Sequence, residues 1–466
     1  MVLIMTLAFF AGLVYHSVNL MVHSKEWIAN PMNDHLPAHE EMELAGKIFD
    51  RNGVVLAQSV NNKRVYNDDI SIRKACLHIV GDDSVNIGTA VQTVYRSELT
   101  RYTFNGDPAY GLGKPGASTN RKDLVVEGND ITLTIDSRLQ KAALEALGDY
   151  RGAMIFYNYK TGEILCMVST PAYDPANIPA DLQTSDEYEG AYYNRVLSAA
   201  YPPGSTFKLV TALASLSEFQ EAPRFSYDCK GVERIGDNDV VCYEKTAHGQ
   251  VDLKNALAES CNVYFGQLAL YLGRDKMTEY AENAGFNKEL KIDGVEAAQS
   301  TYHVKDATDN QLAWSGVGQY TVLETPINMA MISAAIANGG TPVKPFFVKR
   351  LENGMNEPAR TGKTELADQM MTKEAADKLA EMMAYTVSDN VNYYRLRESL
   401  TVCAKTGTAE VGDGADHAWV TGFTTDEECP LAFAVLVEHG GSGSMVAIPA
   451  AAAVLNKAAE LYKGIL

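Results

Sequence analysis

Three short motifs constrain the fold of this chain more than any other feature. They are Ser205-Thr206-Phe207-Lys208, Ser260-Cys261-Asn262 and Lys405-Thr406-Gly407-Thr408. A serine hydroxyl becomes a nucleophile when a neighbouring base takes its proton, and these motifs supply lysine amines for that purpose. A fold that uses the whole set must bring three distant segments of the sequence to one site.

Each motif also has an accidental copy elsewhere in the chain. Ser71 and Lys74 make a second S-x-x-K, Lys160-Thr161-Gly162 makes a second K-T-G, and Ser388-Asp389-Asn390 makes a second S-x-N. A short string of this kind has little specificity by itself. The surrounding sequence therefore has to separate the functional copies from the accidental ones.

Ser205 follows a segment that breaks regular structure. Tyr201-Pro202-Pro203-Gly204 contains two prolines and a glycine, and an apolar run follows the motif. This pattern predicts a helix that begins near Ser205, with Lys208 one turn later on the same face. The lysine amine can then reach the serine hydroxyl. Ser71 has no such breaker before it, so we predict that Ser205 is the nucleophile.

The middle motif is assigned to Ser260 and Asn262. The segment 251–259 that precedes them has the pattern of a helix ending at a polar turn. In the competing copy, the stretch 389–392 that follows Ser388 is predicted to be a surface loop between a helix and a strand. We therefore expect the competing copy to have no catalytic function.

The third motif follows the apolar run 400–404, which predicts a strand whose edge could pair with an extended substrate backbone. The competing K-T-G separates two alternating apolar runs, 153–157 and 164–168, and is predicted to be a hairpin turn. The assigned residues are Lys405, Thr406, Gly407 and Thr408.

With these motifs and several others, the chain resembles a class B penicillin-binding protein, a monofunctional D,D-transpeptidase of bacterial cell-wall synthesis. One departure is Ala45, where the family usually has arginine. The resemblance implies an α/β fold in which helices sandwich an antiparallel sheet, the penicillin-binding or serine transpeptidase fold. The supporting segments are 46–53, 133–140, 315–319, 325–326 and 417–423.

The chain is predicted to have three parts. Residues 1–23 form a transmembrane anchor, residues 24–130 a mixed α+β pedestal domain, and residues 131–466 the transpeptidase domain. The first part is almost wholly apolar and reaches the length of about 20 residues that spans a membrane. A cleaved signal peptide is the alternative, but a basic start and a small-residue cleavage site are missing. We expect a single-pass cell-membrane protein whose catalytic domain lies outside the cytoplasm, where the family's substrate is found.

Local patterns predict the elements at both ends of the third part. An alternating strand over 131–134 precedes a helix that Asp136 or Ser137 caps. Near the end of the chain, a strand over 431–438 precedes an alanine-rich helix over 448–461. Strands at both ends with helices between them predict a sheet that helices cover.

Composition excludes several other classes of protein. The formal net charge of −19 argues against nucleic acid, whose phosphates need a basic face. No glycine-rich phosphate loop is present, and no cysteine–histidine cluster has metal-ligand spacing, so we predict neither cofactor nor metal. His248 and His417 have no acidic partner at a telling spacing, so a serine–histidine mechanism is rejected and both are predicted to be structural.

The chain contains seven cysteines. Cys229 and Cys242 flank a predicted hairpin centred on residues 236–239, and this pattern fits either a disulfide between them or two free buried thiols. Cys261 and Cys403 adjoin motif residues. Periodicity predicts that these two pack inward as small apolar side chains without a chemical function.

The residue chemistry predicts how the serine is acylated. Lys208 can act as the base if it is uncharged, and both an apolar helix and the charge of Lys405 lower a lysine pKa. Ser260 would relay the proton to the leaving D-alanine nitrogen. Asn262 would donate a hydrogen bond to the substrate amide.

The resemblance implies further contacts with substrate. Lys405 and Thr406 would hold the terminal carboxylate with help from Thr408, and the backbone N–H groups of Ser205 and Thr408 would form the oxyanion hole. An amine of a neighbouring stem peptide then attacks the acyl-enzyme and cross-links the wall. β-Lactams acylate the same serine.

Three function classes stay open at this point. The first is a peptidoglycan D,D-transpeptidase, the second a serine β-lactamase of the S-T-F-K type, and the third a non-catalytic penicillin-binding scaffold or sensor. A β-lactamase needs no pedestal or anchor and usually carries S-x-V, and fully occupied catalytic positions argue against a scaffold. The implied partners are peptidoglycan stem peptides, β-lactams and a polytopic membrane glycan polymerase. Elongation, division and sporulation remain alternatives.

Overall fold

The structure is a computed structural model that describes residues 9–10, 12–13, 15–16, 42, 45–100, 128–219, 225–352, 358–389, 400–412 and 414–464. Its helices are α4 (Ile70–Ala75), α5 (Leu77–Val80), α6 (Val91–Val94), α7 (Arg96–Thr100), α8 (Ser137–Leu147), α9 (Lys208–Glu218), α10 (Leu253–Ala258), α11 (Asn262–Asn283), α12 (Asp309–Ser315), α13 (Pro326–Ala337), α14 (Lys373–Asp389) and α15 (Ile448–Lys463). Its strands are β1 (Ile48–Phe49), β2 (Val55–Val60), β3 (Lys63–Tyr66), β4 (Asp130–Leu133), β5 (Gly152–Asn158), β6 (Ile164–Thr170), β7 (Tyr227–Cys229), β8 (Val232–Ile235), β9 (Asn238–Val241), β10 (Gly249–Val251), β11 (Lys291–Ile292), β12 (Val295–Glu296), β13 (Val348–Glu352), β14 (Pro358–Thr361), β15 (Val402–Ala409), β16 (His417–Thr424) and β17 (Leu431–Val437).

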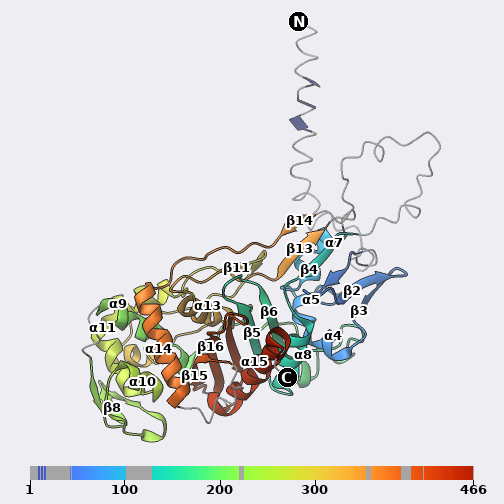
Figure 1. Ribbon diagram of the computed structural model, residues 1–466. Helices are drawn as coiled ribbons and strands as arrows, with labels where there is room; N and C mark the ends of the chain where they lie inside the picture. Colours follow the sequence, from blue (N-terminus) through green and yellow to red (C-terminus); the bar gives the residue numbers. More distant parts are fainter. Residues whose placement is uncertain are drawn as a thin grey trace, which may run out of the picture.

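A five-stranded sheet in the order β15-β16-β17-β5-β6 forms the centre of the molecule (Figure 1). Every neighbouring pair in it is antiparallel. Alternate residues of a strand point to opposite faces, and in β5 Ala153 and Ile155 join one hydrophobic cluster while Met154 and Phe156 join another. Apolar side chains on both faces explain why β5, β6 and β17 are continuous hydrophobic runs.

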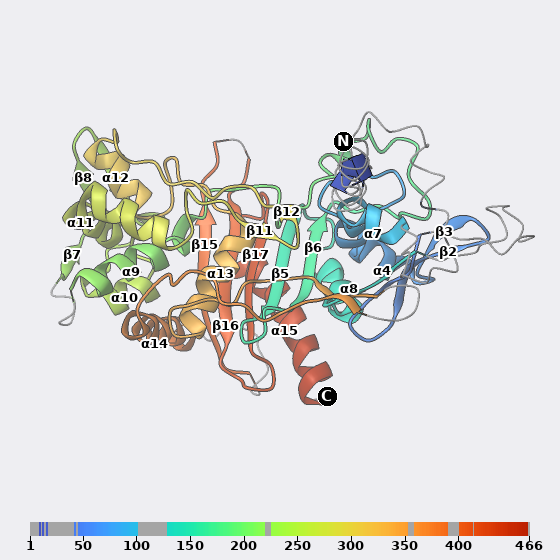
Figure 2. The same ribbon diagram turned by 90° about the horizontal axis from the view of Figure 1, so that it is seen from above.

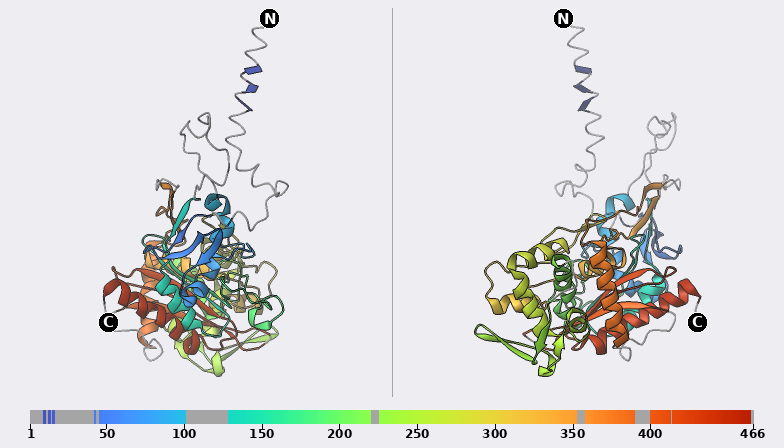
Figure 3. Two further views of the ribbon diagram at one scale, coloured as in Figure 1. Left: turned by 90° about the vertical axis from the view of Figure 1, so that its right-hand side faces the viewer. Right: turned by 60° about the vertical axis from the view of Figure 1, so that its left-hand side comes forward.

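Helices cover both faces of this sheet, as predicted. On one face α8 and α15 lie side by side (Figure 3), and they pack through Leu139, Ala143, Ala451 and Leu455. On the other face α13 packs on β17, β16 and β5, and α14 packs on β15. The side chain of Asp136 accepts a hydrogen bond from the Arg138 N–H and caps α8, which confirms the predicted start of that helix.

A helical region and a second sheet lie at opposite ends of the central sheet (Figure 2). The helical region contains α9 to α12 and the hairpin of β8 and β9. The second sheet has six strands in the order β14-β13-β4-β1-β2-β3. It mixes segments from both sides of the predicted boundary at residue 130, since β4 pairs in parallel with β1 and antiparallel with β13.

The accidental copies of the first and third motifs lie in a helix and in a turn between two strands. Ser71 lies in α4. Lys160-Thr161-Gly162 forms the turn between β5 and β6, as predicted, where Gly162 has a φ of 84°.

The loop predicted for 389–392 begins too early, because Asp389 still belongs to the last turn of α14, as does Ser388. The Ser388 Oγ donates a hydrogen bond to the Tyr385 carbonyl, which lets the hydroxyl stay in the helix. Residues 390–392 of the predicted loop lie outside the described residues.

Most of the predicted transmembrane anchor, residues 1–23, lies outside the described residues. Among the residues that are described, the segment Gly443–Lys463 is helical, long and apolar enough to cross a membrane. Half of its apolar window is buried, and its α15 part packs on the central sheet. It is therefore a core helix of this fold.

Candidate active site

Ser205 lies in a single turn of 3-10 helix, Gly204–Thr206, directly before α9. The Gly204 N–H donates to the Gly318 carbonyl at 2.9 Å, and Gly204 has a φ of 53°. A Cβ at Gly204 would lie 2.5 Å from the Thr408 carbonyl oxygen. Only glycine fits this approach, so the proline–glycine segment packs the serine turn directly against strand β15.

Lys208 begins α9 and brings the first two motifs together. Its Nζ lies 3.0 Å from the Ser205 Oγ and 3.1 Å from the Ser260 Oγ. It also donates at 2.6 Å to the Ser260 carbonyl and at 2.6 Å to the Asn262 Oδ1. The side chain is fully buried, whereas Ser205, Ser260 and Asn262 are half-buried.

These contacts suit a neutral amine. The Ser260 carbonyl and the Asn262 Oδ1 are pure acceptors, so they take the two N–H groups of an uncharged lysine. The remaining lone pair of Nζ then faces the hydroxyls of Ser205 and Ser260. The geometry therefore permits the amine to accept the Ser205 proton.

Burial lowers the pKa of Lys208 to about 8. Burial, followed by the charge of Lys208, lowers the pKa of Lys405 well below its usual value. The predicted repulsion between the two amines contributes to the lowered pKa of Lys405, whereas burial is the largest cause of the lowered pKa of Lys208. Desolvation by the apolar surroundings thus makes the neutral form of Lys208 more accessible near neutral pH.

The second motif forms a tight connection between α10 and α11. Ser260 has a φ of 52°, in the left-handed region that a residue with a Cβ seldom adopts. Cys261 caps α11, and the Asn262 Nδ2 donates to the Val241 carbonyl at 2.8 Å. This conformation turns both the carbonyl and the hydroxyl of Ser260 toward Lys208.

The third motif lies on β15, the edge strand of the central sheet. The Lys405 Nζ donates to the Ser260 Oγ at 3.0 Å and to the Thr406 carbonyl at 3.0 Å. Thr406 and Thr408 are half-buried, and a Cβ at Gly407 would lie 2.8 Å from the Pro203 carbonyl oxygen. The structure thus brings all the predicted catalytic residues to one place, and an edge strand leaves backbone groups for an extended ligand.

Two further segments support the nucleophile turn, and their functions were not apparent from the sequence. Gly318, in the segment 315–319, accepts from Gly204 as described above, and the Gly316 carbonyl accepts from the Thr211 hydroxyl of α9 at 2.8 Å. The Trp419 Nε1 of β16 donates to the Pro202 carbonyl at 3.0 Å. The one signal in the sequence was that both segments, 315–319 and 417–423, belong to those through which the chain resembles the family.

His417 keeps the structural function predicted for it. Its Nδ1 accepts from the His439 N–H at 3.1 Å, and its ring packs edge-on against Tyr201. Cys403 is buried on β15, and burial raises the pKa of its thiol to about 12, as expected of a packing residue.

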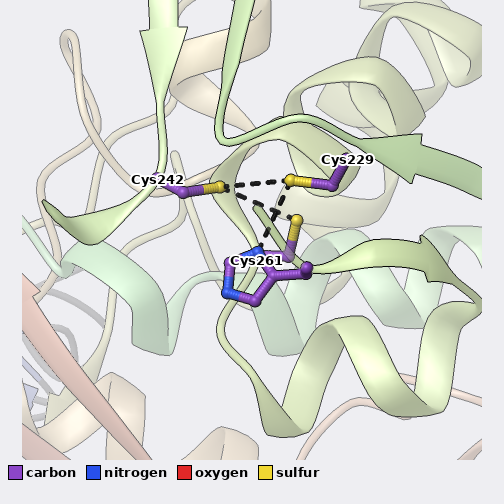
Figure 4. A group of neighbouring side chains, drawn as sticks. Cys229, Cys242 and Cys261 are labelled. Carbon is purple, nitrogen blue, oxygen red and sulfur yellow. Dashed lines mark hydrogen bonds between the residues drawn. The ribbon is translucent and has the colours of Figure 1, made fainter. Parts of the chain in front are cut away.

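The structure decides between the two alternatives for Cys229 and Cys242, and it brings together cysteines and a histidine that the sequence did not connect. Cys229 and Cys242 flank a hairpin as predicted, and they are free and buried, the second of the two alternatives, with their Sγ atoms 3.7 Å apart. They form one group with Cys261 and His248, whose ligand atoms all lie within 4.8 Å of one another (Figure 4). The sequence indicated no such cluster because its members are widely spaced and come together only through the β7–β10 pairing and the cap of α11.

Known proteins resemble this chain in sequence and in structure. The penicillin binding protein transpeptidase domain family matches residues 152–460. The chain is 30% identical to peptidoglycan D,D-transpeptidase PbpA of Mycolicibacterium smegmatis, over 72% of this chain and 73% of that protein. It is 28% identical to peptidoglycan D,D-transpeptidase MrdA of Haemophilus influenzae, over 72% of this chain and 57% of that protein.

Solved structures of a penicillin-binding protein and of a D,D-transpeptidase domain are also similar to this chain. Penicillin-binding protein A from M. tuberculosis, as a ceftriaxone acyl-enzyme complex, superposes with a TM-score of 0.78 at 26% identity, covering 91% of this chain and 100% of that one. The D,D-transpeptidase domain of a peptidoglycan glycosyltransferase from Eggerthella lenta superposes with a TM-score of 0.77 at 27% identity, covering 91% and 99%.

Proposed function

The chain belongs to the penicillin-binding protein transpeptidase family, in its class B group, and from this premise we propose how its residues perform the reaction. It is a serine-type peptidoglycan D,D-transpeptidase that β-lactams acylate. The nucleophile is Ser205 and the base is Lys208. One observation carries this assignment: a buried lysine amine with its two N–H groups engaged lies 3.0 Å from the serine Oγ.

Acylation begins when neutral Lys208 takes the Ser205 proton. The Ser205 Oγ attacks the carbonyl carbon of the penultimate D-alanine of a stem peptide, and the backbone N–H groups of Ser205 and Thr408 stabilise the oxyanion. The C–N bond then breaks and D-alanine leaves. Its nitrogen receives the proton from Lys208 through the Ser260 hydroxyl, which lies 3.1 Å from Nζ.

The third motif and Asn262 orient the substrate. Lys405 and Thr406 bind the terminal carboxylate, with the Thr408 hydroxyl helping, and Asn262 donates to the substrate amide. The edge position of β15 supports this assignment, because an extended peptide can add to the sheet there. The contact of Lys405 with the Ser260 Oγ links carboxylate binding to the proton relay.

An amine from a neighbouring stem peptide completes the cycle. It attacks the acyl-enzyme carbonyl and gives up a proton to Lys208, which is neutral again after D-alanine has left. The C–O bond to the Ser205 Oγ then breaks, Lys208 passes that proton to the Oγ, and the cross-link is formed. A serine β-lactamase would instead hydrolyse the acyl-enzyme with water. It is the alternative function that shares the same acylation chemistry. The similarity to D,D-transpeptidases over most of the chain favours the transfer to an amine.

The arrangement of the protein at the membrane is also proposed. The apolar residues 1–23 anchor the chain in the cell membrane with a single pass, residues 24–130 form the pedestal, and residues 131–466 form the catalytic domain outside the cytoplasm. A polytopic glycan polymerase is the proposed partner, since a monofunctional transpeptidase needs newly made glycan strands as substrate.

Covalent labelling with a fluorescent penicillin tests the proposal. We expect the full chain to be labelled on Ser205, with the label retained for many minutes, and Ser205→Ala to abolish labelling. Ser388→Ala is the matched control for the accidental S-x-N copy and should label like the unmodified chain. Rapid release of hydrolysed drug would establish the β-lactamase alternative, and loss of labelling in Ser388→Ala would overturn the assignment of the middle motif.

A further inference from the structure

A groove with a volume of about 270 Å³ opens between helix α12 and the end of strand β15. Three segments line it: α12, the two residues that follow Gly318, and the residue that follows β15. None of the lining residues belongs to the three motifs, and the reaction described above gives them no function. They are Asn310, Gln311, Trp314, Gln319, Tyr320 and Glu410.

The groove begins beside the turn that carries the nucleophile. In that turn, the Gly204 N–H donates to the Gly318 carbonyl at 2.9 Å. On the other side, a Cβ at Gly204 would lie 3.0 Å from the Ala409 Cα. Gln319 directly follows Gly318 in the sequence, and Glu410 is the residue after β15. These two lining residues therefore extend from the two backbone segments that enclose the nucleophile turn.

The polar side chains on the α12 side of the groove are engaged in holding the fold together. The Asn310 Nδ2 and the Trp314 Nε1 donate to backbone carbonyls of β9 at 3.2 and 3.3 Å. The Gln311 Oε1 accepts from the Thr308 N–H at 2.8 Å and completes the cap of α12. This side of the groove is therefore a fixed wall, with the half-buried ring of Trp314 as part of its surface.

The polar side chains beside the serine turn are free for a ligand. Among the residues that the structure describes, the Glu410 carboxylate has no cationic partner. Within the same part of the chain, the Gln319 amide and the Tyr320 hydroxyl form no hydrogen bond. Glu410 is exposed, Gln319 is half-buried and Tyr320 is 44% exposed. A ligand in the groove can therefore use all three groups.

These groups select a cation. A carboxylate accepts charge-assisted hydrogen bonds from an ammonium, and the faces of tryptophan and tyrosine attract the same charge. No lysine or arginine is among the described residues that line the groove. We propose that the groove binds the acceptor stem peptide, with Glu410, Trp314 and Tyr320 around the side-chain ammonium of its diamino residue. This inference rests on the proposed function, since it names the residues that select the attacking amine.

Strand β15 separates this negative site from the positive site proposed for the donor carboxylate. Lys405 precedes Thr408 by three residues, and Glu410 follows Thr408 by two. At about 3.3 Å per residue these steps span about 10 Å and about 7 Å. The backbone N–H of Thr408, proposed for the oxyanion hole, thus lies between a cationic and an anionic side chain. Donor and acceptor then approach the acyl carbonyl from opposite ends of the strand.

The bound ammonium becomes the nucleophile only after it loses a proton. One proton leaves to solvent, and the lone pair of the neutral amine forms the new C–N bond. A second proton passes to Lys208 during the attack and then to the Ser205 Oγ as the C–O bond breaks. Glu410 takes part in none of these bond changes. Its function is to bind the acceptor and to raise the concentration of the acceptor beside the acyl-enzyme.

Competition between two amines for the acyl-enzyme of the full chain tests the groove. An N-acylated D-alanyl thioester acylates Ser205 with loss of a thiol. The first amine, Nα-acetyl-L-lysyl-D-alanine amide, has a single charge, the side-chain ammonium. The second, hydroxylamine, is uncharged at neutral pH and too small to fill the groove. Mass spectrometry measures the amide and the hydroxamate formed at increasing concentrations of each amine.

Substitution of Glu410 should affect only the lysyl peptide. Glu410→Gln should raise the KM of that acceptor about twofold to fivefold, the range of an exposed ion pair, with the rate at saturation unchanged. Glu410→Lys should raise it further through repulsion, and added salt should reduce both effects. Glu427→Gln is the matched control, because Glu427 is an exposed glutamate at the opposite end of β16. The control variant should behave like the unmodified chain.

Tyr320→Asn tests the aromatic part of the site. Tyr320 has a φ of 66°, a conformation that asparagine adopts more readily than most residues, so the turn keeps its backbone. Loss of the ring should raise the KM of the lysyl peptide about twofold to fivefold. An unchanged rate with hydroxylamine would show that the serine turn is intact.

Penicillin labelling separates this inference from the proposed function. Labelling should be the same in the unmodified chain and in the Glu410 variants. Slower acylation in those variants would place the donor in the groove and overturn the proposal, as would an unchanged KM for the lysyl peptide. If the unmodified chain is not labelled, the proposed function fails, and equilibrium binding of the lysyl peptide decides about the groove. Weaker binding to Glu410→Lys would support the site, and equal binding would refute it.

Discussion

At the scale of the residue, the proposed mechanism depends on the protonation state of Lys208, since only its neutral amine can take the proton of Ser205. Lys208 is fully buried, so desolvation favours its neutral amine. The two N–H groups of that neutral amine still have acceptors, the Ser260 carbonyl and the Asn262 Oδ1. A lysine in water would hold its proton at neutral pH. The apolar interior thus converts an ordinary cation into a base.

The rate of acylation should therefore follow the titration of Lys208. Its pKa is lowered to about 8, and only the neutral form accepts the serine proton. Below that pH the second-order rate constant should fall about tenfold for each pH unit, and above it the rate should level off. Stopped-flow measurements with a fluorescent penicillin over a pH series would check this. A rate constant that does not change through this range would show that another group takes the proton.

At the scale of the element, close contact of loops with strand β15 positions the nucleophile. Gly318 has a φ of 86°, and a Cβ there would lie 2.1 Å from the Gly204 carbonyl oxygen. This glycine belongs to the segment 315–319, which has no chemical group to offer. Its function is to let the backbone approach the serine turn.

Gly318→Ala should therefore displace the serine turn. We expect slower penicillin labelling, on the order of 10²-fold for a shift of about 1 Å, together with a loss of about 1–2 kcal/mol of stability from the positive φ. Gly53→Ala is the matched control, since Gly53 has a φ of 84° but no atom within 4 Å of its added Cβ. It should lose stability to a similar extent and keep its labelling rate. Equal labelling rates in the two variants would contradict the argument.

At the scale of the whole molecule, a buried carboxylate joins the six-stranded sheet to the catalytic region. Asp50 follows β1 and is fully buried. It accepts hydrogen bonds from the N–H groups of Asn52 and Val54 and from both the N–H and the hydroxyl of Ser137, at the start of α8. The segment 46–53 thus has a structural explanation: it connects two parts of the chain that lie far apart in sequence.

Asp50→Ala should destabilise the protein, because it leaves buried donors without an acceptor. Each such donor costs about 1–3 kcal/mol, so the free energy of unfolding should fall by at least that amount. Urea unfolding of the full chain measures it. Asp377→Ala removes an exposed carboxylate paired with Lys373 and should change stability by less than about 1 kcal/mol. Similar midpoints for the two variants would show that Asp50 is not the link described.

Local patterns in the sequence were enough to predict the side chains that the structure brings together at the candidate site, and many of the elements. The proline–glycine break before Ser205, the cap of α8 and the apolar run before Lys405 are short-range features, and helices and strands follow short-range periodicity. The accidental copies were also recognised from their neighbours. Even the misassigned Asp389 lies only at the end of the helix that precedes the predicted loop, where boundaries are least certain.

Tertiary structure alone decided which distant residues meet. Lys405 donates a hydrogen bond to Ser260, which lies 145 positions earlier in the sequence. Strand β13 pairs with β4 in the six-stranded sheet. The sequence, read locally, predicted a disulfide or two free thiols at Cys229 and Cys242, whereas the fold adds Cys261 and His248 to them. The reason is physical: a periodic pattern records which face of an element is buried, but which faces then share a core depends on how the whole chain packs.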